Sequence, residues 1–153
     1  MEHVFKVEEM PEQSALAIRE TAAVAEIPAK MGECFDALCR FFGERRIPFA
    51  GPPFALYHSW SDAATVMDVG FPVSAGTAGE GRIQAITLPG GRIVTGTHIG
   101  PYDKIVETYN AMDSWMKANG LTPAPLMWET YLTDPQAEPD PSKWVTRLFW
   151  PLA

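Results

Sequence analysis

Cysteine and histidine are scarce in this sequence, which has two cysteines and three histidines among its 153 residues. Cys34 and Cys39 form no Cys-x-x-Cys motif, so we interpret them as reduced, structural residues rather than a redox pair. His3, His58 and His98 lie far apart, without the close spacing of metal ligands. We therefore expect neither a metal site nor a cofactor, and we interpret His58 as a core histidine.

Positive charge is also in short supply. Lys and Arg number 12 against 19 Asp and Glu, the net charge is −7 and the sequence pI is about 4.9. A nucleic-acid surface needs a basic face, so we expect no nucleic-acid partner, whereas an acidic protein attracts organic cations. No segment has the apolar length of a membrane span, and the N-terminal "MEHVFKVEEM" lacks a signal-peptide pattern. We expect a cytoplasmic protein without membrane contact.

The sequence does contain a weak internal repeat, in which four segments recur in the same order. The first is a predicted hairpin with Pro11 or Pro89 at its turn. The second is an amphipathic helix whose apolar residues, Tyr109 among them, match at an offset of 74. A strand at an offset of 72 and a closing strand at an offset of 79 follow. The repeat predicts one domain over 1–153, built from half-domains at about 1–74 and 80–153.

These patterns predict an α+β fold, with each half-domain arranged β-β-α-β-β around antiparallel sheets and one long helix. A pseudo-two-fold axis would relate the half-domains and place a ligand groove in the centre. Pro101 and Gly120 mark the ends of the second helix. The expected helices cover about 30–46 and 102–118. The expected strands lie near 4–9, 14–20, 54–59, 64–72, 82–88, 92–98, 126–133 and 144–150.

The functional prediction depends on the strand in "LMWETYLTDP" (126–135). Side chains alternate across a strand, so one face carries Trp128 and the other carries Met127, Glu129 and Tyr131. We expect the Trp128 face to pack under the helices and the Glu129 face to be the non-core side. An antiparallel sheet can also expose one face to water, where an isolated glutamate is ordinary. Both interpretations stay open, although the many aromatic side chains favour a pocket.

The repeat extends this candidate site into the first half-domain. An offset of 72 makes Tyr57 equivalent to Glu129, and the predicted axis would bring both side chains toward the centre. The closing strands add Trp144 and Trp150, with Phe71 as the equivalent of Trp150. Aromatic faces attract cations, methionine adapts to varied shapes and a buried carboxylate needs a positive partner. This mixture predicts a pocket for a flat, apolar and cationic molecule.

A catalytic role for the same residues is an alternative. Desolvation raises the pKa of a carboxyl and so suits Glu129 to general acid or base catalysis. Tyr57 or Tyr131 would then stabilise a developing oxyanion. Residue types alone do not separate binding from hydrolysis.

Several segments resemble one known family. The doubled layout, the helix "GPYDKIVETYNAMDSWMKANGL" (100–121), the strand "WETYLTDP" (128–135) and the closing "RLFWPL" (147–152) resemble GyrI-like small-molecule-binding domains. These domains are the effector-binding domains of AraC-type and MerR-type multidrug regulators. The resemblance implies that lipophilic, often cationic aromatic compounds bind between the half-domains, with Glu129 as the anionic anchor. It also implies that Tyr131 and either Trp144 or Trp150 line the pocket.

The resemblance implies further alternatives as well. The sequence shows no helix-turn-helix or basic region, so we expect a stand-alone member rather than a transcription regulator. Stand-alone members are associated with sequestration of drugs or toxins, with inhibition of DNA gyrase and, in one branch, with hydrolysis of cyclopropane-bearing genotoxins. We predict binding of a small molecule, with a hydrolase that uses Glu129 and Tyr57, and a protein contact with gyrase, as the alternatives.

Overall fold

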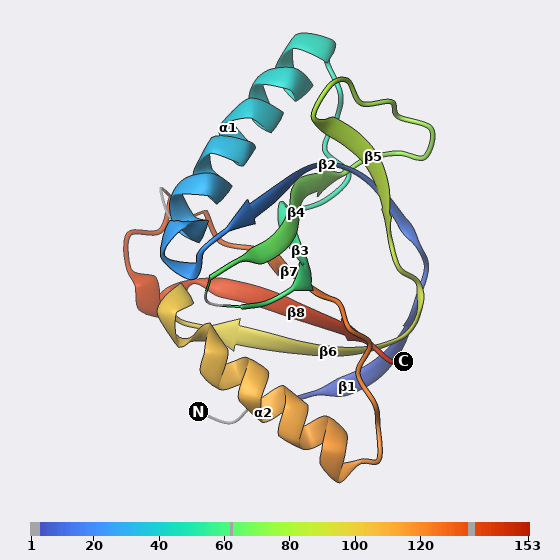
Figure 1. The fold of residues 1–153 in the computed structure, drawn as a ribbon, viewed down its shortest axis with the longest axis vertical. Coiled ribbons are helices and arrows are strands. Elements are labelled where there is room, and N and C mark those ends of the chain that lie inside the picture. The colour runs from blue at the N-terminus through green and yellow to red at the C-terminus, as the bar shows by residue number, and fades with distance from the viewer. Residues whose placement is uncertain (1–3, 62, 135–136) are drawn as a thin grey trace. The chain divides into compact units, whose positions relative to one another are not determined.

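The computed structural model describes residues 4–61, 63–134 and 137–153, and it has the predicted α+β fold (Figure 1). The chain forms two compact units, and each contains one long helix. We call Pro11–Pro89 the α1 unit after its helix α1 (Ile27–Arg45). Residues up to Met10 join Gly90–Ala153 in the α2 unit, named after helix α2 (Ile105–Ala118). No helix in the described part of the chain is both long and apolar enough to cross a membrane.

The α1 unit contains a four-stranded antiparallel sheet. Its strands are β2 (Gln13–Ala22), β3 (Phe54–Ser59), β4 (Thr65–Pro72) and β5 (Ile83–Leu88), in the order β5-β2-β4-β3, and a short 3-10 helix, η1 (Val24–Glu26), leads into α1. Helix α1 begins three residues earlier than predicted, because Pro28 fits the first turn of a helix. It ends where Arg46 takes a left-handed conformation with φ of 55°.

The α2 unit repeats this arrangement with the strand order β1-β6-β8-β7. Its strands are β1 (Lys6–Met10), β6 (Gly91–Ile99), β7 (Met127–Tyr131) and β8 (Val145–Pro151), and two short 3-10 helices are η2 (Tyr102–Lys104) and η3 (Pro141–Lys143). The helix predicted over 102–118 is therefore a 3-10 turn that continues as α2. All eight predicted strands form, within a few residues of their expected ends.

The two predicted hairpins are wrong. Strand β1 pairs with β6, whose residues lie about 85 positions later in the chain, rather than with its sequence neighbour β2. Strand β2 has no edge left for β1, because β5 and β4 occupy its two sides. Figure 1 shows the blue β1 beside the yellow β6. Pro11 and Pro89 mark the places where the chain passes between the units rather than hairpin turns.

This pairing changes how the repeat relates to the compact units. Each unit combines the last three strands and the helix of one predicted half-domain with the first strand of the other. Local sequence patterns favour pairing between neighbouring strands, so they give no sign of an exchange over such a distance. The internal repeat itself stays a prediction.

Both cysteines are free thiols. Cys34 lies on the buried side of α1, and its thiol lies 3.7 Å from the carboxylate of Glu20. Burial and the neighbouring negative charge raise the pKa of Cys34 to about 11. Such a thiol is a poor nucleophile, which agrees with the structural role predicted for it.

The core of the α2 unit lies between α2 and its sheet. Its buried members are Phe5, Val94, Met112, Met116 and Leu148. A Cβ atom on Gly96 would lie 2.6 Å from the ring of Phe5, so the bare backbone of β6 makes room for this ring. Leu148 is fully buried on the same side of the sheet. The side chains that share its face of β8 and β7 therefore point toward α2.

We expect Gly70→Ala to destabilise the α1 unit. A Cβ atom at this position in β4 would lie 2.2 Å from the backbone oxygen of Leu16 and 2.8 Å from the Cβ of Ala17. Neither atom is the end of a flexible side chain, so the paired strands must separate. The loss in free energy of unfolding should be about 3 kcal/mol, measured by urea denaturation.

Gly32→Ala is the matched control, since a Cβ on this glycine of α1 meets nothing within 4 Å. Alanine is the better helix former, so this variant should gain up to about 1 kcal/mol. Equal stabilities for the two variants would contradict the close packing at Gly70.

Candidate functional site

Strand β7 positions Glu129 through its pairing with β8. Glu129 lies opposite Leu148 and Tyr131 lies opposite Thr146. Residues that face each other across antiparallel strands share one face of the sheet, and Leu148 belongs to the core under α2. Glu129 therefore lies on the face that α2 covers.

This placement corrects the prediction that the Trp128 face packs under the helices. Trp128 is buried, as expected, but on the opposite side of the sheet, where its ring stacks on Phe149 at 5.1 Å. Alternation along the strand separates the two sets of side chains correctly. It does not say which set meets a helix, because both faces of this strand carry large apolar groups.

The carboxylate of Glu129 is almost completely enclosed, with 5% of the residue exposed. The hydroxyl of Tyr109, on α2, donates a hydrogen bond of 2.8 Å to Glu129 Oε1, and Tyr131 also hydrogen-bonds to this side chain. Burial raises the pKa of Glu129 to about 7, although both tyrosine hydrogen bonds act to lower it. The site thus holds a carboxyl group that titrates near neutral pH.

Aromatic rings surround this carboxyl group within the α2 unit. The ring of Tyr102 lies 5.6 Å from Tyr131 and 5.0 Å from Trp144, and Tyr109 lies 6.2 Å from Trp150 in an edge-on arrangement. Burial, together with the negative charges of Glu129 and Asp134, raises the pKa of Tyr102. Glu129 is therefore close enough to this ring cluster to influence its ionisation.

Both tryptophans in this cluster donate a hydrogen bond from the indole N–H group to a backbone oxygen. Trp144 Nε1 donates to the backbone oxygen of Glu138 at 2.7 Å, and Trp150 Nε1 donates to that of Ala124 at 3.1 Å. The indole N–H groups are thus already paired, and what remains for interaction is the ring surface. Such surfaces attract cations.

No positive side chain balances Glu129 within the described ranges: the ion pairs found there all involve other carboxylates. A buried carboxylate without a cation is unusual in a protein core, because its desolvation is not offset. The ion pairs of the described residues thus leave the ionised form of Glu129 without a positive partner.

Five of the seven predicted site residues lie in the α2 unit. Tyr131 contacts both Glu129 and Tyr102, so it joins the carboxylate to the ring cluster. Met127 is half-buried and shares the Glu129 face by alternation. The predicted set in this unit comprises Met127, Glu129, Tyr131, Trp144 and Trp150.

The other two predicted residues lie in the α1 unit. Tyr57 is buried on β3, with its ring 5.2 Å from the exposed Trp60. Phe71 is buried on β4 and packs against Phe35 of α1 at 5.6 Å and Phe49 at 4.5 Å. Phe71 is thus part of an aromatic cluster with α1.

The strand registers do not fit both predicted equivalences, that of Tyr57 with Glu129 and that of Phe71 with Trp150. Tyr57 pairs with Met67, which lies four positions before Phe71, whereas Tyr131 pairs with Thr146, four positions before Trp150. If Phe71 matches Trp150, as predicted, Tyr57 corresponds to Tyr131. The two predicted equivalences thus differ by two residues. A shift of two residues keeps every side chain on its face, so alternation does not reveal it.

The sequence interpretation missed Tyr102 and Tyr109. Tyr109 was assigned to the apolar stripe of the helix, although its hydroxyl holds Glu129. The two tyrosines are seven positions apart, which places both on one side of a helix after two turns. Two phenols at this spacing, ahead of a strand with a glutamate, were the signal available in the sequence.

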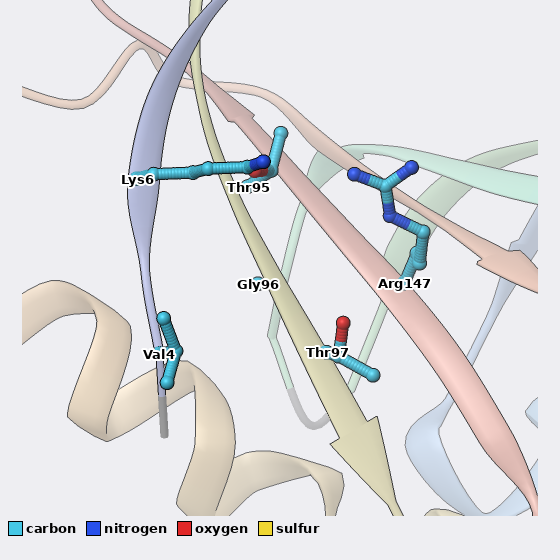
Figure 2. A pocket seen from close by; sticks show the side chains of 6 residues that line it. All are labelled: Val4, Lys6, Thr95, Gly96, Thr97 and Arg147. Carbon is cyan, nitrogen blue, oxygen red and sulfur yellow. The ribbon is translucent and has the colours of Figure 1, made fainter.

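A hollow of about 330 Å³ lies elsewhere in the α2 unit, lined by Val4, Lys6, Thr95, Gly96, Thr97 and Arg147 (Figure 2). Arg147 precedes Leu148 on β8 and so points to the face opposite α2. Glu8 accepts a hydrogen bond of 2.6 Å from Thr95, which is the main cause of its lowered pKa, and it also pairs with Arg147 at 3.3 Å. The charges at this hollow are thus paired within the protein, unlike Glu129.

We expect Tyr109→Phe to raise the pKa of Glu129 further above its ordinary value. The variant removes a hydrogen bond that stabilises the ionised carboxylate but leaves the ring that buries it. The measurement is a carbon-13 NMR titration of the glutamate carboxyl groups. Thr97→Val, on the opposite face of the sheet, is the control, and an unchanged pKa in Tyr109→Phe would show that the hydrogen bond has no influence.

Several solved structures share this fold. EcmrR, in its complex with DNA, is 19% identical with a TM-score of 0.85, and the match covers 98% of this chain and 57% of that one. This chain thus spans little more than half the length of that relative. The separate structure of the EcmrR C-terminal domain is 20% identical with a TM-score of 0.77, and the match covers 100% of this chain and 99% of that one.

Two further structures have the same fold at lower similarity. SAV2435, bound to tetraphenylphosphonium, is 11% identical with a TM-score of 0.68, over 98% of this chain and 94% of that one. A hydrolase from Listeria innocua is 17% identical with a TM-score of 0.65, over 97% of this chain and 91% of that one. Together these structures show that the chain shares its fold with the C-terminal domain of EcmrR, SAV2435 and this hydrolase.

The chain belongs to the GyrI-like small molecule binding domain family, whose model matches residues 3–153. This confirms the resemblance found in the sequence. No curated protein matches the chain in sequence.

Proposed function

We propose that this chain binds lipophilic, aromatic cations and that Glu129 is the anion that holds them. The observation that carries the proposal is the buried carboxylate of Glu129, enclosed by tyrosine and tryptophan rings and without an ion pair in the described part of the chain. Tyr131, Met127, Trp144 and Trp150 would line the site, together with Tyr102 and Tyr109. Tyr57 and Phe71 remain predicted ligand contacts.

The energetics favour a cation over a neutral guest. Burial disfavours the ionised form of Glu129, which is why its pKa lies near 7. A bound cation supplies the missing positive partner and restores the ordinary tendency of the carboxyl group to ionise. The ring faces add cation–π attraction in the same desolvated space.

The comparisons support this proposal at the level of the family and the fold. The family is one of small-molecule binding domains, and SAV2435, which has this fold, binds tetraphenylphosphonium, a lipophilic aromatic cation. The DNA complex of EcmrR involves a chain that is much longer than this one, so it supports no proposal of DNA binding here.

Titration with tetraphenylphosphonium at several pH values tests the proposal. Glu129 is neutral below a pKa of about 7 and charged above it, so affinity should rise with pH and level off near pH 8. Below the pKa the gain is at most tenfold for each pH unit, because one proton is released on binding. Isothermal titration calorimetry gives the affinities, and a flat profile from pH 5.5 to 8.5 would contradict the anchor role of Glu129.

Hydrolysis is a second candidate, favoured by one observation. A carboxyl group with a pKa of about 7, in contact with the Tyr109 hydroxyl at 2.8 Å, has the properties of a general acid or base at neutral pH. The Listeria innocua hydrolase shows that the fold occurs in a hydrolase. Incubation with an aromatic cyclopropane electrophile tests this candidate: ring-opened product should exceed the amount of protein, and Glu129→Gln should abolish the turnover.

A further inference from the structure

The hydroxyl of Thr146 on β8 is an anomaly in the core of the α2 unit. Thr146 is fully buried, and its Oγ1 has no hydrogen-bond partner among the described residues. Buried hydroxyl groups are paired in the large majority of cases, so an exception calls for a specific reason. Valine has nearly the same shape and would fill the position without this penalty.

Thr146 lies beside Glu129 in the sheet. It faces Tyr131 across the β7–β8 ladder and His98 across the β6–β8 ladder, so all three side chains share the α2 face. Leu148, two positions further along β8, faces Glu129. Thr146 and Glu129 are therefore diagonal neighbours on this face of the sheet, with their Cα atoms roughly 7–8 Å apart.

The polar neighbours of Thr146 are committed elsewhere. His98 Nδ1 contacts Thr108 Oγ1 at 2.7 Å, and His98 Nε2 lies 2.9 Å from the backbone oxygen of Pro101. Tyr131 is a hydrogen-bond partner of Glu129. The contacts given for the two side chains that face Thr146 across the ladders thus go to other groups, and the Thr146 hydroxyl has no partner among the described residues.

We propose that Thr146 Oγ1 accepts a hydrogen bond from a ligand held by Glu129, so that the site selects cations with N–H donors. The proposal rests on the binding function inferred above. A protonated amine forms N–H···O bonds of about 2.8 Å in several directions, so one ammonium group can bridge two oxygens placed diagonally on a sheet. A quaternary ammonium has the same charge but no donor, and it would use Glu129 alone.

Two matched probes separate these contributions. Protonated 4-phenylbenzylamine and 4-phenylbenzyltrimethylammonium share the biphenyl group and the charge, and they differ in their N–H donors. Thr146→Val should weaken binding of the amine about tenfold at pH 8 and change binding of the trimethylammonium probe less than about twofold. Thr146→Ser keeps a hydroxyl and should retain most of the affinity for the amine.

The outcomes distinguish the inference from the function on which it rests. Equal losses for both probes, or no loss for the amine, would overturn the role of Thr146 while Glu129→Gln still weakened both. If Glu129→Gln left both affinities unchanged, or if neither probe bound the parent protein, the binding function and this inference would both fall. Thermal unfolding checks the fold of Thr146→Val, and Thr146→Ala replaces it in the same assay if the valine variant is unstable.

Discussion

Glu129→Gln is expected to weaken binding of tetraphenylphosphonium about a hundredfold at pH 8. Two opposite charges about 5 Å apart attract by about 3 kcal/mol at an effective dielectric constant near 20, and the variant removes this attraction. The amide keeps the size of the side chain and an oxygen for the Tyr109 hydrogen bond, so the aromatic surroundings should persist. Calorimetric titration of both proteins measures the difference.

Tetraphenylborate makes this experiment specific for charge, because it has nearly the shape of tetraphenylphosphonium and the opposite sign. The parent protein should reject the borate, and Glu129→Gln should bind it more tightly than the parent does. Glu8→Gln is the matched control: it removes one negative charge from the same unit, at a carboxylate on the opposite face of the sheet that is paired with Arg147. A similar loss of phosphonium binding in both variants would assign the effect to net charge rather than to Glu129.

The same variant should make the protein more stable at high pH. The pKa of Glu129 is about 7 in the folded state, against an ordinary value of 4.5, so the folded protein holds a proton that the unfolded chain has lost. Stability of the parent therefore falls as pH rises from about 4.5 to 7 and is constant above. Glutamine does not titrate, so the stability of Glu129→Gln relative to the parent should increase by about 2 kcal/mol from pH 5.5 to 8.5.

Urea denaturation across this range measures the effect, with Glu8→Gln again as the control. The pKa of Glu8 is lowered, so its contribution is complete above the ordinary value of 4.5 and is lost only as pH falls below it. The difference between Glu8→Gln and the parent should thus be constant from pH 5.5 to 8.5. A constant difference for Glu129→Gln as well would mean that Glu129 is not desolvated in the folded protein.

Part of the grouping of side chains around Glu129 could be predicted from the sequence, because it depends on local chemistry. A glutamate within an aromatic strand is unusual wherever the strand lies, and alternation correctly grouped Glu129 with Tyr131 and apart from Trp128. The two tryptophans of the last segment belong to the same ring cluster, because Trp144 packs against Tyr102 and Trp150 against Tyr109. The tyrosines themselves were missed because a phenol on an apolar helix face has the pattern of an ordinary core residue.

The types of the helices and strands, and the family, could be predicted from the sequence, since helix periodicity, strand alternation and turn residues are properties of short segments. The pairing of β1 with β6, and the face of the sheet that α2 covers, were decided only by the tertiary structure. Both depend on contacts between residues far apart in the chain. Packing between these residues decides such contacts, and local sequence preference does not. The pKa of Glu129 is of the same kind, because the sequence supplies the carboxyl group and the surrounding core removes the water.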